Sequence, residues 1–245
     1  MKRILTTIIA AMLLSLALNA QDLKVISYNI RNSQEKDGTN SWVYRYAASA
    51  EMVQDQKADV IGLQEALSDQ VRFFEQNFKD YKWAGESATI LWNRKTVSLQ
   101  KSGSFDVATW ALFKDKETGR KFYVVNVDLD KTPAEERKEA VAQVIERTEA
   151  LNKESLPVVI TGGFFMKPGD AALADLDSKM TNARKSAEKT DNTGTYNNWG
   201  KTSEIRDHIY YVGFTACPEY QTITKKYTDR KFISDHFPLM VQLTF

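Results

Sequence analysis

The chain has 245 residues, of which 42% are hydrophobic and 27% charged, which is enough for one sizeable core and lacks the bias of disordered or fibrous chains. Its 33 basic and 32 acidic side chains give a formal charge of +1, whereas proteins that hold nucleic acid through its phosphates usually carry a clear basic excess. The single cysteine, Cys217, excludes an intrachain disulfide and a zinc site built on several thiolates, and we expect it to be a small buried hydrophobe.

The first twenty residues have the pattern of a secretory signal peptide. Lys2 and Arg3 precede an apolar run over residues 4–18, which ends in a small-residue cleavage point at Ala20. An uncleaved membrane anchor is the competing interpretation, but about fifteen apolar residues fall short of the ~20 that a spanning helix needs. We therefore expect an exported chain, periplasmic or secreted, with one domain over residues 21–245 and no membrane span after removal of the signal.

From residue 23 onward, short apolar or alternating runs are separated by runs with helical spacing. The first kind is rich in β-branched residues, and the longest helical run opens at Pro133 with acidic charge in its first turn. Predicted strands cover residues 23–30, 58–63, 89–92, 107–113, 121–129, 158–161, 205–213, 220–225 and 237–245. Predicted helices cover residues 44–56, 69–78 and 133–152, and a short helix follows Pro168.

The connections are consistent with this order of elements. Residues 114–121 contain Gly119 between two strands and predict a hairpin, whereas residues 185–199 predict a loop. Strands that alternate with helices and hairpins predict an α/β fold, a four-layer sandwich of two packed mixed β-sheets flanked by helices, with active residues at the strand ends. Aromatic residues of the late segments are expected in the core rather than on a ligand face: Tyr196, Trp199, Tyr210 and Tyr211.

Four segments each place polar groups at the end of an apolar strand. Taken singly these groups are weak signals, because an asparagine there is ordinarily a turn former and a lone glutamate usually faces water. Together, their order and spacing resemble the endonuclease/exonuclease/phosphatase superfamily, and the resemblance runs from about residue 23 to residue 245. The segments read SYNIR at 27–31, DVIGLQEA at 59–66, RDHIY at 206–210 and SDHFP at 234–238.

The resemblance implies a metal site and a catalytic dyad. Family residues that match Asn29 and Glu65 hold a divalent metal through oxygen, which suits Mg²⁺ or Mn²⁺, and Asp235 lies near that metal. Residues that match Asp207 and His236 form a dyad in which the carboxylate orients the imidazole beside the scissile phosphate. The neighbouring His208 should point away from Asp207 because side chains alternate along a strand, so we expect it to be structural.

Two other family motifs are altered. Where the family reads Asn-Thr-His-Leu-Asp, this chain has Asp128 in place of the phosphate-binding histidine, and we keep Asp128 as a candidate catalytic residue. Where the family reads Thr-Gly-Asp-Phe-Asn, Gly163 replaces the aspartate that activates water and Phe165 replaces the asparagine that binds phosphoryl oxygens. Loss of a general base typically costs about 10²–10⁴ in rate, and each lost oxyanion donor about 10²–10³. The expected hydrolase activity is therefore low or absent.

Three functions remain open. The first is a catalytically impaired family member that uses the remaining cleft to bind a ligand or a partner of unknown identity. The second is a working Mg²⁺- or Mn²⁺-dependent phosphoesterase, acting on a phosphorylated small molecule or a phosphodiester, in which Asp128 and the His236–Asp207 pair replace the missing groups; Asp128 could instead join Glu65, Asp207 and Asp235 in one oxygen-rich metal site. The third is a structural envelope protein that keeps these side chains only as hydrogen-bond partners.

Overall fold

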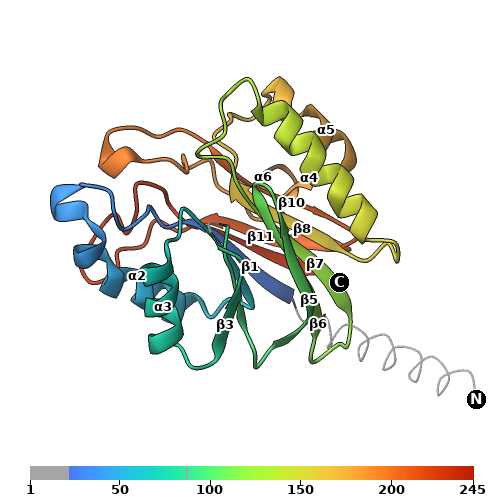
Figure 1. Ribbon diagram of the computed structural model, residues 1–245, viewed down its shortest axis with the longest axis horizontal. Helices are drawn as coiled ribbons and strands as arrows, with labels where there is room; N and C mark the ends of the chain where they lie inside the picture. The colour runs from blue at the N-terminus through green and yellow to red at the C-terminus, as the bar shows by residue number, and fades with distance from the viewer. Residues whose placement is uncertain (1–21, 87) are drawn as a thin grey trace, which may run out of the picture.

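The computed structural model of the protein describes residues 22–86 and 88–245, so the predicted signal peptide over residues 1–20 lies outside the described residues. Two six-stranded sheets pack face to face, and helices cover both outer faces (Figure 1). The predicted α/β four-layer sandwich is therefore confirmed. Within the described ranges, no helix has the length and apolar character needed to cross a membrane.

Both sheets are mixed. The strands are β1 (Asp22–Asn29), β2 (Val60–Gln64), β3 (Tyr81–Ala84), β4 (Ile90–Asn93), β5 (Val97–Phe105), β6 (Ala108–Asp115), β7 (Lys121–Asp128), β8 (Val158–Gly163), β9 (Thr181–Asn182), β10 (Asp207–Val212), β11 (Ala216–Thr222) and β12 (Leu239–Thr244). One sheet has the order β11-β12-β1-β2-β4-β3 and the other β5-β6-β7-β8-β10-β9. The β1–β2 and β7–β8 pairs are parallel, whereas the other pairs are antiparallel.

The longer helices lie on the outer faces of the sheets. The α-helices are α2 (Trp42–Gln56), α3 (Ser68–Asn77), α4 (Arg137–Leu151), α5 (Ala174–Lys179) and α6 (Ala183–Ser186), and the 3-10 helices are η1 (Gly38–Asn40), η2 (Ala171–Leu173) and η3 (Asn198–Gly200). In Figure 1, α2 and α3 lie on one side of the sandwich and α4 and α5 on the other.

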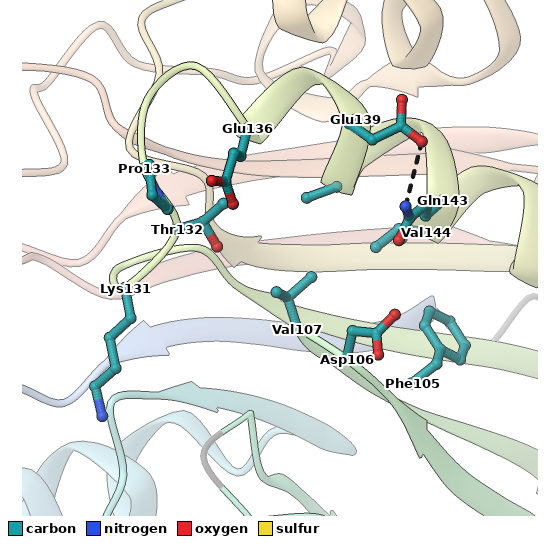
Figure 2. Close-up of a pocket in the computed structure, with 11 residues that line it drawn as sticks. Phe105, Asp106, Val107, Lys131, Thr132, Pro133, Glu136, Glu139, Gln143 and Val144 are labelled. Atoms are coloured by element: carbon teal, nitrogen blue, oxygen red, sulfur yellow. Dashed lines mark hydrogen bonds between the residues drawn. The ribbon is translucent and has the colours of Figure 1, made fainter.

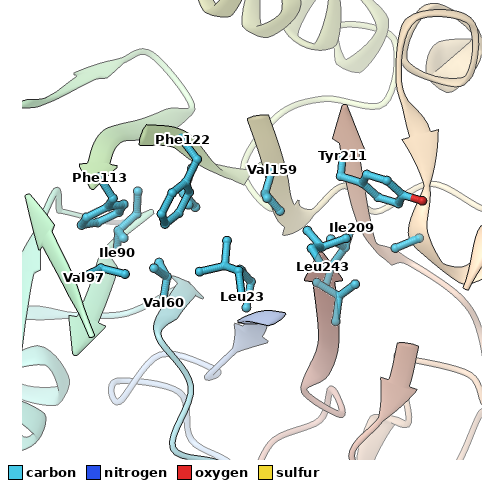
Figure 3. Packing of buried hydrophobic residues seen from close by; sticks show 14 of the residues in the cluster. Leu23, Val60, Ile90, Val97, Phe113, Phe122, Val159, Ile209, Tyr211 and Leu243 are labelled. Carbon is cyan, nitrogen blue, oxygen red and sulfur yellow. The ribbon is translucent and has the colours of Figure 1, made fainter. Parts of the chain in front are cut away.

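Three apolar cores join the four layers. Alternation along β1 sends Leu23 and Val25 into the core between the sheets and Ile26 and Tyr28 toward α2 and α3. Figure 3 shows the core between the sheets, where Leu23 of the first sheet faces Phe122 of the second. The third core lies between β7, β8 and α4. Because the central strands of both sheets are covered on both faces, the polar motif residues lie at the strand ends and in the loops.

The structure differs from the sequence-based prediction in a few elements. β3 and β5 were not predicted; β5 has mostly exposed or half-buried polar residues at the edge of its sheet, so it lacks the apolar alternation that identifies a strand. The helix predicted from Pro133 begins at Arg137, because residues 133–136 form a turn closed by the Glu136 N–H donating to the Pro133 carbonyl. The predicted hairpin at residues 114–121 is present, and Gly119 has a φ of +73°.

Three of the five individual residues that the sequence analysis expected in the core are buried. Cys217 lies in the core between the sheets, where burial raises the pKa of its thiol to about 12, and Tyr210 and Tyr211 are buried as well. Tyr196 and Trp199 instead lie half-buried in the loop before β10. The prediction of core positions was therefore wrong for these two residues: Tyr196 lies against His236, and Trp199 lies against the Arg45 guanidinium.

Arg45 of α2 is fully buried and binds the chain segments that carry the site. Its guanidinium donates to the backbone carbonyls of Ile30, Arg31, Asn40 and Ile233, at 2.6–3.1 Å. Two of these carbonyls follow Asn29 directly, and a third precedes the SDHFP segment. Arg45 therefore fixes the β1 end relative to the segment before β12.

Replacement of Arg45 by methionine should destabilise the protein. Methionine keeps most of the volume but removes all four hydrogen bonds. Other side chains still donate to the Arg31 and Ile233 carbonyls, whereas those of Ile30 and Asn40 lose their side-chain donor, and we expect the free energy of unfolding to fall by about 3 kcal/mol. Urea unfolding would measure this, with the exposed Arg72→Met on α3 as the matched control. A loss below about 1 kcal/mol in Arg45→Met would contradict this role of the guanidinium.

Candidate active site

The ends of strands from both sheets meet at one edge of the sandwich. β1 ends at Asn29, and the parallel β2 ends one residue before Glu65. In the second sheet, the pairing register places Asp128, Gly163 and Asp207 side by side across β7, β8 and β10. The fold therefore brings the positions of the separate sequence motifs to one region.

Glu65 and Asn29 form the first part of the site. The Asn29 side-chain amide donates to Glu65 Oε1 at 2.8 Å, whereas the buried Glu65 Oε2 has no hydrogen-bond partner among the described residues. Burial raises the pKa of Glu65 to about 7, and the carboxylates of Asp130, Asp235 and Asp128 add to this effect. Glu65 therefore presents one unsatisfied carboxylate oxygen.

Asp207 and His236 form the predicted pair. His236 Nδ1 lies 2.7 Å from Asp207 Oδ2, and the Thr195 hydroxyl donates to the same oxygen. Burial disfavours the protonated imidazole, but the carboxylate of Asp207 outweighs it and raises the pKa of His236 above its usual value. The buried Asp207 Oδ1 has no partner among the described residues. The geometry is that of an imidazole oriented by a carboxylate.

Two aromatic rings close over this imidazole. The Tyr196 ring lies 4.9 Å from the His236 ring, and the Phe165 ring lies 5.8 Å from it. His236 is only 1% exposed. A Cβ atom added at Gly163 would lie 3.2 Å from the Phe165 ring, so the ring borders the space that a larger residue 163 would fill. The imidazole is therefore flanked by both rings and almost wholly removed from solvent in this conformation.

Phe165 is held firmly in this position. Its backbone has a φ of +57°, and its N–H and carbonyl bond to the Arg206 carbonyl and the Arg137 guanidinium at 2.9 and 2.8 Å. The Arg137 guanidinium carbon also lies 5.6 Å from the centre of the Phe165 ring. A positive φ is uncommon for a bulky residue and is better tolerated by asparagine, the family residue at this position.

Asp128 lies beside Glu65 rather than beside His236. Its Oδ2 accepts from the backbone N–H of Glu65 at 2.7 Å, and its Oδ1 accepts from the N–H of Asp130 at 3.1 Å. Burial raises the pKa of Asp128 to about 6, while these two hydrogen bonds act in the opposite direction. Both carboxylate oxygens therefore have protein donors.

Asp235 is accompanied by Arg31. The Arg31 Nη1 lies 3.7 Å from Asp235 Oδ2, and the Ser234 hydroxyl donates to Asp235 Oδ1 at 3.2 Å. The same guanidinium also pairs with Asp37 at 3.1 Å. Part of the negative charge expected to face a metal is therefore neutralised by a protein cation.

The arrangement of these carboxylate oxygens determines whether a divalent metal fits the site. In residues 22–86 and 88–245 no group of three or more His, Cys, Asp or Glu side chains is arranged to hold a metal, so Glu65, Asp128, Asp207 and Asp235 do not converge as joint ligands in this structure. Mg²⁺ keeps several waters and commonly uses only one or two carboxylates. The unsatisfied Glu65 Oε2 fits that mode of binding, with Asn29 holding the carboxylate in place.

An open cleft of about 830 Å³ lies next to Glu65 and Asp128. Its lining has five acidic and two basic side chains: Glu35, Glu65, Asp106, Asp128, Asp130, Lys36 and Lys131. A neighbouring cavity of about 310 Å³ shares four lining residues with the cleft and reaches the start of α4 (Figure 2). The accessible space beside Glu65 and Asp128 is therefore lined by more acidic than basic side chains.

The sequence did not predict Thr195 and Tyr196 as site residues, whereas His208 was expected to point away from Asp207. Thr195 and Tyr196 lie in a segment predicted only as loop, and no motif marked them; the single signal was the aromatic character of Tyr196. His208 Nε2 lies 2.8 Å from the Met166 carbonyl and its ring packs on Phe164, away from Asp207, which confirms its structural role.

Stability should fall as the pH rises across the neutral range. The folded pKa of Glu65, about 7, lies above its usual 4.5, so the folded state prefers protonated Glu65 and loses this contribution as pH rises from 4.5 to about 7. Asp128 acts in the same direction up to about pH 6, and the raised pKa of His236 means that its contribution is also lost at high pH.

Glu65→Gln should therefore flatten the pH dependence. Glutamine keeps the acceptor for Asn29 without the charge, and we expect stabilisation at about pH 8, relative to wild type, on the order of 2 kcal/mol, with little change at about pH 4.5. Urea unfolding with EDTA present would measure it, using the exposed Glu75→Gln as control. Equal pH dependence in wild type and Glu65→Gln would show that Glu65 is not responsible.

Comparison with known proteins agrees with this geometry. A mannosyl-6-phosphatase from Bacteroides thetaiotaomicron is 25% identical in sequence to this chain. The structural alignment covers 91% of this chain and 100% of the phosphatase, with a TM-score of 0.83. An endonuclease/exonuclease/phosphatase family protein from the same organism is 24% identical, with 92% and 98% covered and a TM-score of 0.83. The human Nocturnin catalytic domain with bound sulfate is 16% identical, with 92% and 94% covered and a TM-score of 0.73.

A search of curated protein sequences gives no significant match. The family model described as "Endonuclease/Exonuclease/phosphatase family" matches residues 26–236, which include every candidate site residue named above. This chain therefore belongs to the endonuclease/exonuclease/phosphatase family.

Proposed function

We propose that this protein is an exported member of the family with impaired hydrolysis, which binds a ligand in the cleft beside Glu65 and Asp128. The observation that carries the proposal is the seal over His236, which is 1% exposed between the rings of Phe165 and Tyr196. A general acid or base must come within hydrogen-bonding reach of the reacting group, and a covered imidazole does not.

The replacements next to the seal support the same conclusion. Gly163 has no side chain to activate water, and Phe165 places a ring where the family has an amide that binds phosphoryl oxygens. Asp128 has both oxygens bonded to backbone N–H groups, so it does not supply the missing base in this arrangement. None of the three altered positions offers a replacement for the lost chemistry.

The character of the cleft supports ligand binding of a different kind. Its five acidic side chains exceed its two lysines, and carboxylates repel an anionic phosphate at short range. A ligand with hydroxyl or amino groups would instead donate hydrogen bonds to these carboxylates. Its size, about 830 Å³, is within the range of small-molecule sites.

An active Mg²⁺- or Mn²⁺-dependent phosphoesterase is the second candidate. It is favoured by the intact Asp207–His236 pair at 2.7 Å and by the unsatisfied Glu65 Oε2, which could hold a metal that polarises a phosphoryl oxygen. The similarity to a mannosyl-6-phosphatase would make a phosphorylated sugar its substrate class. This candidate requires Phe165 to move away from His236.

Hydrolysis assays separate the two candidates. We expect purified wild type, with Mg²⁺ or Mn²⁺, to turn over bis-p-nitrophenyl phosphate and p-nitrophenyl phosphate no faster than Glu65→Ala. The repair variant carries both Gly163→Asp and Phe165→Asn, because a side chain at 163 would press on the ring at 165, and asparagine there also restores the family residue. Restoring a base and a phosphate donor should raise metal-dependent turnover by about 10² or more.

The opposite result would identify an enzyme. Metal-dependent turnover by wild type that is abolished in Glu65→Ala would contradict impairment. Phe165→Ala alone serves as a control, since it opens the site without restoring the base.

A further inference from the structure

We infer that Asp128 is a positioning residue: it spans the two sheets, holds the turn at Glu65, and through that turn places the Glu65 carboxylate. Asp128 belongs to β7 of the second sheet, whereas Glu65 follows β2 of the first. The hydrogen bond from the Glu65 N–H to Asp128 Oδ2, at 2.7 Å, therefore crosses between the sheets at the site itself.

Glu65 needs such support because of its backbone conformation. Its φ is +58°, a left-handed conformation that costs an L-residue roughly 1–2 kcal/mol and persists only where its surroundings impose it. The Asp128 carboxylate accepts from the N–H of this same residue. A carboxylate acceptor makes a stronger hydrogen bond than a neutral one.

The backbone and the carboxylate of Asp128 are themselves held by hydrogen bonds. Its own N–H donates to the Val107 carbonyl at 2.9 Å, and the next residue, Leu129, donates to the Gly163 carbonyl at 3.0 Å. Its Oδ1 accepts from the N–H of Asp130 at 3.1 Å, which fixes the rotation of the carboxylate. The side chain that holds Glu65 is therefore anchored to the strands on both sides of β7.

Asp128 extends a line of contacts that begins deeper in the sandwich. Asn126, two residues earlier and on the same face of β7, donates to the Leu63 carbonyl at 2.7 Å. The contacts from β7 thus follow the first sheet from residue 63 to residue 65. The Asn29 amide then holds the Glu65 carboxylate from the other side, at 2.8 Å.

This role changes how the family site would be restored. A histidine at 128 would replace the carboxylate that accepts from the Glu65 N–H, so adding Asp128→His to the Gly163→Asp/Phe165→Asn variant should lower its metal-dependent turnover, not raise it. That consequence rests on the proposed function. The positioning role itself does not, because it can be measured without turnover and without metal.

The test is NMR of the protein over residues 21–245, comparing wild type with Asp128→Ala, Asp128→Asn and Asp130→Asn. The readouts are hydrogen exchange of the Glu65 backbone amide and the side-chain amide signals of Asn29. In Asp128→Ala we expect the Glu65 amide to exchange about tenfold faster or more, and the Asn29 signals to shift toward those of an unbound amide. Asp128→Asn keeps one acceptor oxygen, so its Glu65 amide exchange rate and its Asn29 signals should lie between those of wild type and Asp128→Ala.

Asp130→Asn is the matched control. It removes a neighbouring negative charge in the same cleft without touching the bond to Glu65, and both readouts should stay within about twofold of wild type. Unchanged exchange of the Glu65 amide in Asp128→Ala would overturn the inference, and so would faster exchange with unchanged Asn29 signals. If Asp128→Ala does not fold, the same readouts in Asp128→Asn decide, since half of the acceptor capacity is lost there.

Discussion

The buried side chain of Asn126 determines how the two sheets meet at the edge that carries the site. Its amide donates to the carbonyls of Leu63 and Thr89 in the first sheet, and its oxygen accepts from Gln64 and from Thr161 of the second. Gly62 leaves room for this amide, since a Cβ there would lie 2.5 Å from its oxygen. All four hydrogen-bonding positions of Asn126 are thereby used in a buried environment, where an unmade bond is costly. The β2 end is fixed against β7, and the positions that follow, Glu65 and Asp128, meet as a consequence.

The altered motif positions form a physically coupled group. The Phe165 ring has its place because Gly163 lacks a side chain, and the ring in turn covers His236. Arg137 binds the carbonyl of Phe165 and packs on its ring, so the left-handed backbone is supported from outside the site. The Asp207–His236 pair is buried beside this ring. A Cβ at Gly163 would lie 3.2 Å from the Phe165 ring, so a side chain at 163 requires the ring to shift and the two positions are coupled.

Much of the fold could be predicted because buried strands and helices place apolar residues at regular intervals in the sequence. Runs such as residues 23–30 and 158–161 alternate or are wholly apolar where both faces are covered, and the motif residues follow at the strand ends. β5 was missed because an edge strand with an exposed face does not require apolar residues. The positions of Asn29, Glu65, Asp207 and His236 could be predicted from the family motifs, but the contacts made by Asp128, Phe165 and Tyr196 could not. Those contacts depend on loop conformation and on which hydrogen-bond donors lie near a carboxylate. Neither feature produces a periodic pattern of residues in the sequence.

We propose that Phe165 and Tyr196 keep phosphate away from His236. The chain contains only two histidines, so the imidazole ¹⁵N and ¹H signals of His236 can be followed during a titration with inorganic phosphate and Mg²⁺, with His208, bound to the Met166 carbonyl, as an internal reference. We predict that the His236 signals of wild type do not move and that those of Phe165→Ala do. A saturable shift of His236 in wild type, at the same phosphate concentrations, would contradict the account and identify an accessible catalytic centre.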